Sequence, residues 1–311
     1  MEEQSKKIGK VSMGKKTKEI NWLSRQSIQD KLMKLFIYIC LTAGGIIICI
    51  PFWWMISTSL KVPGREFIFP PEWIPNPIYW RNYIEGWVGT GTGRGLDFTR
   101  WLGNTVFITG FSMIGTIISV SLVAYGFARL RFPGRDMLFI LCLITMMIPQ
   151  QVTMVPIFIL FRWMGWLDTF KPLIIPHYFA AGSIGAFYIF LMRQFYLTIP
   201  PELTDAAIID GCGAFGVFSR IMFPLSKPAV GIMAVFSFIF HWNDFMNPLI
   251  YLYSYEKYTL ALGLRFFQGM FTIRWAQLMA VSLLVLLPCV VLFFVAQKYY
   301  IQGIVITGVK G

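Results

Sequence analysis

Few side chains in this sequence of 311 residues could perform chemistry. The two histidines, His177 and His241, are too few for a metal cluster or for a catalytic triad that uses histidine. Of the five cysteines, only Cys212 lies outside the long apolar segments, so no disulfide framework is predicted. The nucleotide-binding sequence G-x-x-x-x-G-K-[ST] does not occur. We therefore expect no metal site, no bound cofactor and no catalytic residue in this chain.

Two polar groups lie within otherwise apolar segments, where they could line a pathway. The first pairs amides with a residue that bends helices, because Gln150 and Gln151 precede Pro156. The second, HWNDFMNP, combines an aromatic ring with a carboxylate and amides and contains Trp242, Asn243, Asp244 and Asn247. Polar side chains in such segments usually face the interior of a helix bundle. The alternative is hydrogen bonding between helices or, for the second group, a position at a membrane surface.

Composition and segment length predict an integral membrane protein. The chain is 56% hydrophobic and 14% charged, and its mean hydropathy is +0.63, whereas soluble proteins carry about 25% charged residues. A membrane-spanning helix needs about 20 predominantly apolar residues. Segments of this kind are Leu35–Leu60, Trp101–Ala128, Met137–Phe161, Pro172–Met192, Trp275–Gln297 and Pro228–Tyr255, the last interrupted only by Asp244. We expect an all-α protein with six membrane-spanning helices.

Basic residues predict the orientation of these helices. The segment before the first helix is rich in lysine and is therefore expected in the cytoplasm, and six crossings return the C-terminus to that side. Arg129, Arg131 and Arg135 occupy a short loop on the same side. The net charge of +12 fits anionic lipid rather than nucleic acid, because no folded basic face is visible. The predicted parts are a cytoplasmic tail (1–31), a first helix (32–60), an extracytoplasmic loop (61–100), a core membrane domain (101–297) that includes a cytoplasmic loop (194–228), and a cytoplasmic tail (298–311).

The cytoplasmic loop contains the sequence IPPELTDAAIIDGCGAFGVFSRIMFPLSKP, whose pattern is helical. Pro200 and Pro201 suit the start of a helix, where a missing N–H costs nothing. Gly211 is expected to end this helix, because glycine adopts the left-handed conformation without a Cβ penalty. A second short helix follows until Pro224 and Pro228 end it. The result is a pair of short helices with a glycine corner.

These two helices have the features of a docking element for another protein. Apolar residues on one side of each helix are Leu203, Ala206 and Ala207, then Phe215, Phe218, Ile221 and Met222. The alternative is an amphipathic connector that lies flat on lipid. Such connectors usually have a basic polar face, whereas this one carries Glu202, Asp205 and Asp210. Docking is therefore the favoured interpretation.

The same stretch resembles the EAA motif of ABC importer permeases, E-A-A-x-x-D-G-A-x-x-x-x-x-F-x-x-I-x-x-P-L-x-x-P. Asp205 stands where the motif has Glu, and Cys212 where it has Ala. The residues that match at the motif's spacing are Ala206, Ala207, Asp210, Gly211, Phe218, Ile221, Pro224, Leu225 and Pro228. Further similarity, from FPPEWIPNP through IPQQVTMVP and HWNDFMNPLIYL to QGIVITGVKG, covers most of the chain. This similarity is to MalG-like permease subunits of carbohydrate importers.

The resemblance implies a MetI-like fold in the cell membrane of a bacterium or archaeon and a role in transport without catalysis. In this family a second, MalF-like permease completes the pathway, and an extracytoplasmic sugar-binding protein delivers the carbohydrate. A dimer of cytoplasmic ABC ATPases binds ATP and Mg and docks on the EAA loop. The implied docking residues are Glu202, Asp205, Ala206, Ala207, Asp210, Gly211, Phe215, Phe218, Ile221 and Pro224. In such a pathway, the HWNDFMNP group has residue types that suit sugar hydroxyls and ring faces.

Two other functions are alternatives to this one. A secondary transporter coupled to an ion gradient predicts paired repeats in the two halves of the chain and buried ionisable residues in several helices. No such repeat is visible, and Asp244 is nearly alone. A membrane-embedded enzyme or scaffold predicts His, Cys or carboxylate residues clustered at one depth, and the sequence has no such cluster.

Overall fold

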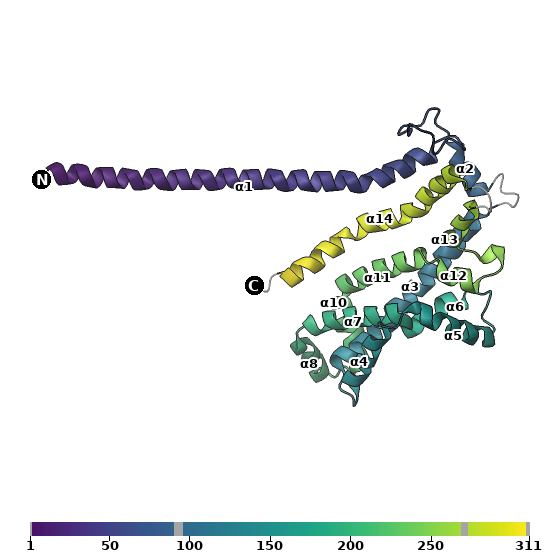
Figure 1. Cartoon of the computed structure of the whole chain (residues 1–311). Helices are drawn as coiled ribbons and strands as arrows, with labels where there is room; N and C mark the ends of the chain where they lie inside the picture. Colours follow the sequence, from purple (N-terminus) through teal and green to yellow (C-terminus); the bar gives the residue numbers. More distant parts are fainter. Residues whose placement is uncertain (1, 90–95, 269–272, 309–311) are drawn as a thin grey trace. The chain divides into compact units, whose positions relative to one another are not determined.

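A computed structural model of the chain describes residues 2–89, 96–268 and 273–308, and these residues are predominantly helical (Figure 1). Besides the helices, the described part contains one isolated bridge, between Gln268 and Ile273. The α-helices are α1 (Glu2–Ser59), α2 (Arg81–Val88), α3 (Phe98–Arg129), α4 (Arg135–Thr145), α5 (Gln150–Trp163), α6 (Lys171–Ile174), α7 (Gly182–Thr198), α8 (Pro201–Ile209), α9 (Ala214–Val217), α10 (Phe223–Leu225), α11 (Lys227–Trp242), α12 (Met246–Tyr251), α13 (Leu260–Gly263) and α14 (Trp275–Gly308). Short 3₁₀ segments are η1 (Ile175–Phe179), η3 (Tyr255–Lys257) and η4 (Leu264–Phe267), and η2 (Phe218–Met222) is a π-helix.

The chain divides into two units. The smaller unit comprises Met1–Ser57, which is most of α1, together with Glu72–Ile74. Within it, the rings of Trp54 and Trp73 meet edge to face with their centroids 5.4 Å apart. The larger unit comprises Thr58–Pro71 and Pro75–Gly311 and contains all the remaining helices. Both candidate sites described below lie in the larger unit.

Four helical segments are long and apolar enough to cross a membrane: Asp30–Ser59, Phe98–Arg129, Lys171–Thr198 and Trp275–Gln297. Two further pairs of helices pass the same test but are bent, α4 with α5 by 98° and Ala214–Leu225 with α11 by 77°. If each bent pair is one crossing, the described residues contain up to six. Large apolar side chains are exposed along these segments, as expected for surfaces that face lipid.

Three of the predicted segments are not single helices, which corrects the expectation from the sequence. The segment Met137–Phe161 bends between α4 and α5, where Pro149 stands before the first residue of α5. The segment Pro172–Met192 breaks at Ala180, which has a φ of 49° between η1 and α7. The segment Pro228–Tyr255 divides after α11, and α12 follows as a separate short helix. Apolar composition indicates that a segment lies within the membrane, but it does not indicate whether its helix is continuous, because broken backbone is tolerated where protein surrounds it.

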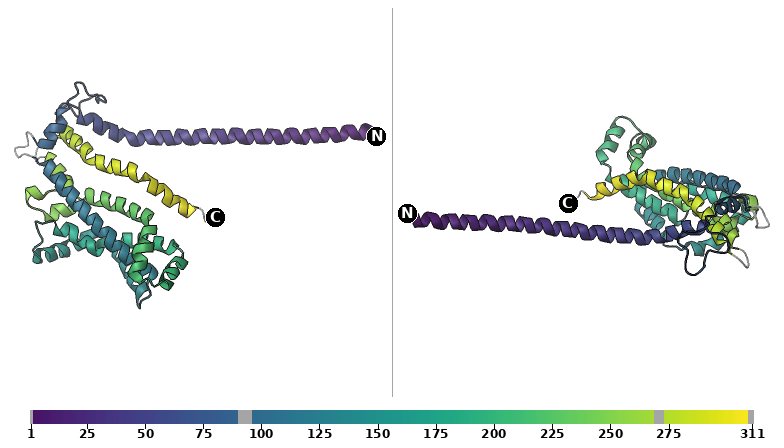
Figure 2. Two further views of the ribbon diagram at one scale, coloured as in Figure 1. Left: turned by 180° about the vertical axis from the view of Figure 1, so that it is seen from behind. Right: turned by 90° about the horizontal axis from the view of Figure 1, so that it is seen from above.

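Helix α3 is the central helix of the larger unit, and α7 and α11 run alongside it (Figures 1 and 2). Asp97 caps its N-terminus, since the Asp97 side chain accepts a hydrogen bond from the backbone N–H of Arg100. Small side chains with a hydroxyl group let neighbouring backbones approach closely, and the hydroxyl can donate a hydrogen bond to a carbonyl of the neighbouring segment. Ser112 Oγ, for example, donates to the carbonyl of Leu173 at 2.9 Å. These contacts hold the broken α6–η1 segment against α3.

Asp168 ties the turn before α6 to the turn after α12. Its carboxylate accepts hydrogen bonds from Lys257 Nζ at 2.8 Å and from the backbone N–H groups of Tyr253 and Ser254 at 2.9 and 2.8 Å. Burial raises the pKa of Asp168, but the hydrogen bonds from Lys257 and Ser254 outweigh this effect and hold the pKa well below its usual range. The two turns are therefore joined through a charged carboxylate.

Candidate functional site

The predicted glycine corner is present in the structure. Helix α8 begins at Pro201, and its N-terminal turn contains Glu202 as expected. Asp210 follows the last residue of α8, and Gly211 then adopts a φ of 85°. This left-handed conformation turns the chain toward α9. The prediction that Gly211 ends the helix is confirmed.

The segment after the corner differs from the prediction at Pro224. The sequence predicts that Pro224 ends the second helix, but this residue lies inside α10, and the helical run reaches Leu225. Proline has no N–H to offer the carbonyl four residues earlier. In the preceding turn the chain forms the π-helix η2, in which the N–H of Phe223 bonds to the carbonyl of Phe218. The change of direction occurs at Ser226, just before α11.

One face of the docking element points into the protein. Ala207, Phe218 and Met222 are buried in a hydrophobic cluster that also contains residues of α3 and α7, and Ile221 packs against this cluster. This face includes Ala207, Phe218 and Ile221, which the sequence pattern assigns to the faces offered to a partner. In the structure these three side chains lie against α3 and α7. Helical spacing shows which residues share a face, but not which face α3 and α7 cover.

The remaining surface of the docking element is exposed and carries several large apolar side chains, and we call it the outward face. Its apolar residues are Leu203, Ile208, Ile209 and Phe215, of which Ile209 is 85% and Phe215 72% exposed. Ala206, Pro224 and the three acids Glu202, Asp205 and Asp210 are exposed as well. Apolar side chains surrounded by charged ones are typical of surfaces that contact another protein or a membrane.

A cavity of about 460 Å³ lies among α5, α6, η1, α7, α11 and α12. Its wall contains polar groups from separate parts of the chain, namely Gln150, Asp244 and Asn247. Most other lining residues are apolar, including Phe161 and Phe240. A cavity of this size with a few convergent polar groups is typical of a binding site for a small molecule.

The three polar residues form one hydrogen-bonded chain. Gln150 Nε2 donates to Asn247 Oδ1 at 3.4 Å, which joins the start of α5 to α12. Asn247 Nδ2 donates to Asp244 Oδ2 at 2.8 Å, and the Asn247 N–H donates to Asp244 Oδ1 at 3.2 Å. The arrangement presents amide and carboxylate groups to the cavity, and these can exchange hydrogen bonds with hydroxyl groups.

The other three predicted pathway residues lie outside the cavity wall. Trp242 is buried, and its indole Nε1 donates to the carbonyl of Val285 in α14 at 3.0 Å. Asn243 donates from Nδ2 to the carbonyl of Ile239 at 2.9 Å and so closes the end of α11. Gln151 is exposed next to Gln150. The interpretation as hydrogen bonding between helices therefore fits Trp242.

His177 is a cavity residue that sequence reasoning missed. It lines the wall, and its ring meets the ring of His241 edge to face, with centroids 4.3 Å apart. Nothing in the sequence signals this contact, because it depends on how η1 packs beside α11. The described residues contain no group of three or more His, Cys, Asp or Glu side chains that could hold a metal ion.

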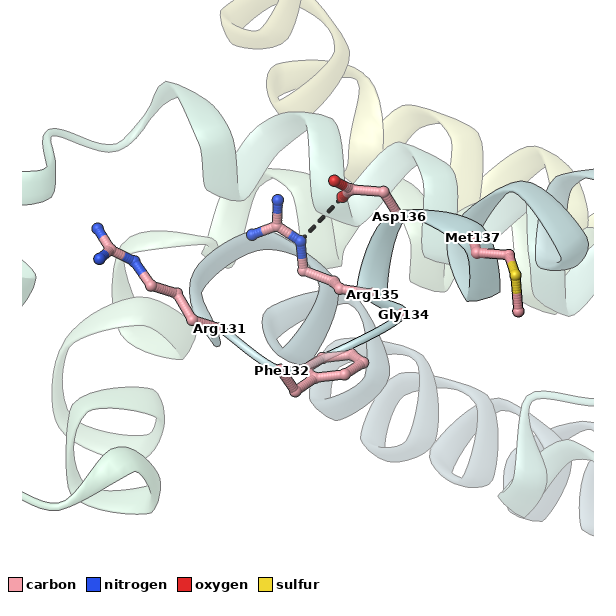
Figure 3. A pocket seen from close by; sticks show the side chains of 6 residues that line it. All are labelled: Arg131, Phe132, Gly134, Arg135, Asp136 and Met137. Carbon is pink, nitrogen blue, oxygen red and sulfur yellow. Dashed lines mark hydrogen bonds and ion pairs between the residues drawn. The ribbon is translucent and has the colours of Figure 1, made fainter.

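The short basic loop between α3 and α4 lines a separate surface hollow (Figure 3). Arg135 Nε bonds to Asp136 Oδ1 at 2.9 Å, whereas Arg131 extends away from this pair. The sequence predicts both arginines on the cytoplasmic side. Among its described lining residues, Asp136 is the one acid and Phe132 the one aromatic residue. The hollow therefore offers a ligand fewer polar side chains than the cavity does.

The sequence family described as "Binding-protein-dependent transport system inner membrane component" matches residues 117–305. The chain is 36% identical over 217 residues to the arabinooligosaccharides transport system permease protein AraQ of Bacillus subtilis, covering 70% of this chain and 75% of that protein. It is 34% identical to the melibiose/raffinose/stachyose import permease protein MelC of the same species, covering 84% and 91%. The crystal structure of a bacterial ABC transporter involved in the import of alginate contains a chain with the same fold. That chain has a TM-score of 0.74 at 22% identity, covering 88% of this chain and 98% of that one.

Proposed function

The chain belongs to the family of binding-protein-dependent transport system inner membrane components, and we propose that it forms half of the pathway of a carbohydrate importer driven by a separate ATPase. Membership confirms the predicted MetI-like fold, the multi-pass membrane location and the role of a transport component rather than an enzyme.

The outward face of the docking element is the observation that carries the proposal. Its apolar side chains, such as Ile209 and Phe215, are exposed, while the reverse side of the same element is packed on α3 and α7. An element built this way can transmit the movement of a bound partner into the membrane helices. We assign this face to a cytoplasmic ABC ATPase dimer, which supplies ATP and Mg.

The cavity supports a carbohydrate as the substrate. Gln150, Asn247 and Asp244 offer donors and acceptors suited to hydroxyl groups, and apolar residues beside them suit the faces of sugar rings. The names of the relatives AraQ and MelC specify oligosaccharides. On the side of the pathway that this chain forms, the described cavity wall carries Asp244 and no lysine or arginine, which favours a neutral oligosaccharide over a sugar phosphate.

The N- and C-termini and the docking element lie in the cytoplasm, in keeping with the lysine-rich segment before the first crossing. A second, MalF-like permease forms the other half of the pathway. The family description names a binding protein, and we place this sugar-binding protein at the extracytoplasmic side.

Uptake of a panel of labelled sugars tests the substrate and the site together. Cells that lack the native gene and carry the wild-type chain should accumulate a neutral oligosaccharide and discriminate against sugar phosphates. Asn247→Ala should reduce uptake while an ATPase still co-purifies with the permease. Accumulation that persists when the ATPase is inactive but the ion gradient is intact would favour the secondary transporter instead.

Truncation of the outward face tests the docking assignment. Phe215→Ala should weaken co-purification of the ATPase by about tenfold, the usual effect of losing an aromatic anchor at an interface. Phe36→Ala in α1 is the matched control, because it removes another exposed phenylalanine, and co-purification should be unchanged. Equal co-purification of both variants would refute the assignment of this face.

A further inference from the structure

The turn between α7 and α8, which is separate from the glycine corner, leaves two backbone carbonyls without their ordinary helical donors. In a continuous helix, the carbonyl of Tyr196 would accept the N–H of residue 200, but Pro200 has none, and the N–H of Ile199 reaches this carbonyl only at 3.3 Å. The carbonyl of Ile199 would accept the N–H of Leu203, which bonds to the carbonyl of Pro200 instead. Carbonyls of this kind require another donor when they are buried.

Arg129 supplies that donor. It lies in the last turn of α3, and its Nη2 donates to the carbonyl of Tyr196 at 2.7 Å and to the carbonyl of Ile199. A positive charge at the C-terminal end of α7 also interacts favourably with the helix dipole. The guanidinium group therefore holds the chain at the point where it leaves the membrane bundle for the docking element.

Tyr125 makes a second contact on the far side of α8. Its hydroxyl donates to the carbonyl of Ala214, the first residue of α9, at 3.0 Å. Its ring also packs against Phe218 of the docking element, with centroids 5.4 Å apart. Tyr125 and Arg129 are four residues apart, so they share one face of α3.

We propose that Tyr125 and Arg129 are positioning residues that attach the docking element to α3 at both ends of α8. This inference rests on the proposed function, because it concerns how that element passes movement to the bundle. One contact precedes α8 and the other follows the glycine corner, so α8 and the corner move together with α3. Neither side chain belongs to the outward face, and neither is needed for the ATPase to bind.

The first experiment measures the position of the docking element in the full chain alone. Spin labels are placed at the exposed residues Ile118 on α3 and Ile209 on α8, after the native cysteines are replaced. We expect one narrow distance distribution for the parent chain and a broader one for Tyr125→Phe and for Arg129→Gln. Arg131→Gln is the matched control, since it removes a neighbouring exposed charge, and its distribution should stay narrow.

The second experiment measures coupling in proteoliposomes that contain the complete importer. Tyr125→Phe and Arg129→Gln should retain bound ATPase but import about two- to thirtyfold less substrate for each ATP hydrolysed, the range expected when a coupling contact is lost. Arg129→Lys should recover part of this ratio, because an ammonium group can reach one of the two carbonyls. A merely structural role would lower the amount of protein in the membrane and leave the ratio unchanged.

The outcomes separate this inference from the proposed function. Unchanged distance distributions in both variants, or an unchanged ratio of import to hydrolysis, would overturn the positioning role even if the importer is active. Failure of the parent chain to bind any ATPase would overturn the proposed function, while the spin-label distances would still decide whether Tyr125 and Arg129 hold the element. Should Arg129→Gln fail to reach the membrane, Tyr125→Phe, which removes a single hydroxyl group, decides the question.

Discussion

Replacement of Gly211 by valine isolates the contribution of the corner between α8 and α9. Gly211 has a φ of 85°, and a Cβ built at this position would meet no atom within 4 Å. The first side-chain carbon therefore meets no neighbouring atom, and the expected effect is on the backbone conformation. A β-branched residue in the left-handed region costs about 1–3 kcal/mol. The chain can avoid this cost only by changing the angle between the two helices.

The expected loss can be estimated from that strain. If the new angle prevents the outward face from contacting the ATPase as one surface, a cost of about 1–3 kcal/mol corresponds to about 5- to 150-fold weaker association. A Cβ at Gly211 would touch no atom of the membrane helices, so the abundance of the variant in the membrane should be normal. The assay is co-purification of the ATPase together with uptake, both divided by the amount of permease.

Two control variants separate backbone strain from side-chain bulk. A Cβ added at Gly213 would also meet no atom within 4 Å, but the φ of this residue is −71°, so Gly213→Val adds the same side chain without strain. Gly211→Asn should stay close to wild type, because asparagine tolerates the left-handed region. If Gly211→Val transports normally, or if Gly213→Val is equally impaired, the reasoning from backbone conformation is refuted.

Three further predictions concern other parts of the chain. A thiol reagent that cannot cross membranes should label Cys212 only after cells are permeabilised, and labelling of intact cells would contradict the cytoplasmic placement of the docking element. The purified chain without its partners should neither bind nor hydrolyse ATP, as measured by equilibrium binding and phosphate release, and turnover by the isolated chain would contradict the assigned division of labour. Asp168→Asn should destabilise the protein by roughly 1.5–3 kcal/mol at neutral pH, because it weakens charged hydrogen bonds. The lowered pKa of Asp168 means that its contribution is complete above about pH 4 and declines as the pH falls toward that pKa. The difference in Tm between wild type and variant should therefore shrink only in strong acid.

Local chemistry made the docking element predictable from sequence. Pro201 can begin a helix and Gly211 can end one whatever surrounds them, and the structure has both features where they were expected. The direction of each face was not predictable in the same way. Phe215 and Phe218 are both aromatic and three residues apart, yet one is exposed and the other packs on Tyr125. Only the positions of α3 and α7 decide between them.

The cavity shows the same limit. The sequence identified Gln150, Asp244 and Asn247 as polar groups in apolar surroundings, and the structure brings them together. It also selected Trp242, which points toward α14 instead. Residues next to one another on a helix point in different directions, and a break after α11 changes the direction again. Which residues of a helix face a cavity therefore depends on how the neighbouring helices pack, and the sequence alone does not reveal this packing.

Helix α11 links the docking element to the cavity directly. It begins at Lys227, with only Ser226 between it and the end of α10, and it ends at Trp242, two residues before Asp244 of the cavity wall. Its 16 residues span about 24 Å. If such a helix pivots at its start by about 10°, its far end moves by roughly 4 Å, which is more than the length of a hydrogen bond. The contact between Gln150 and Asn247, at 3.4 Å, lies beyond that far end. Movement of the docking element therefore has a route to the cavity through α11 as well as through α3.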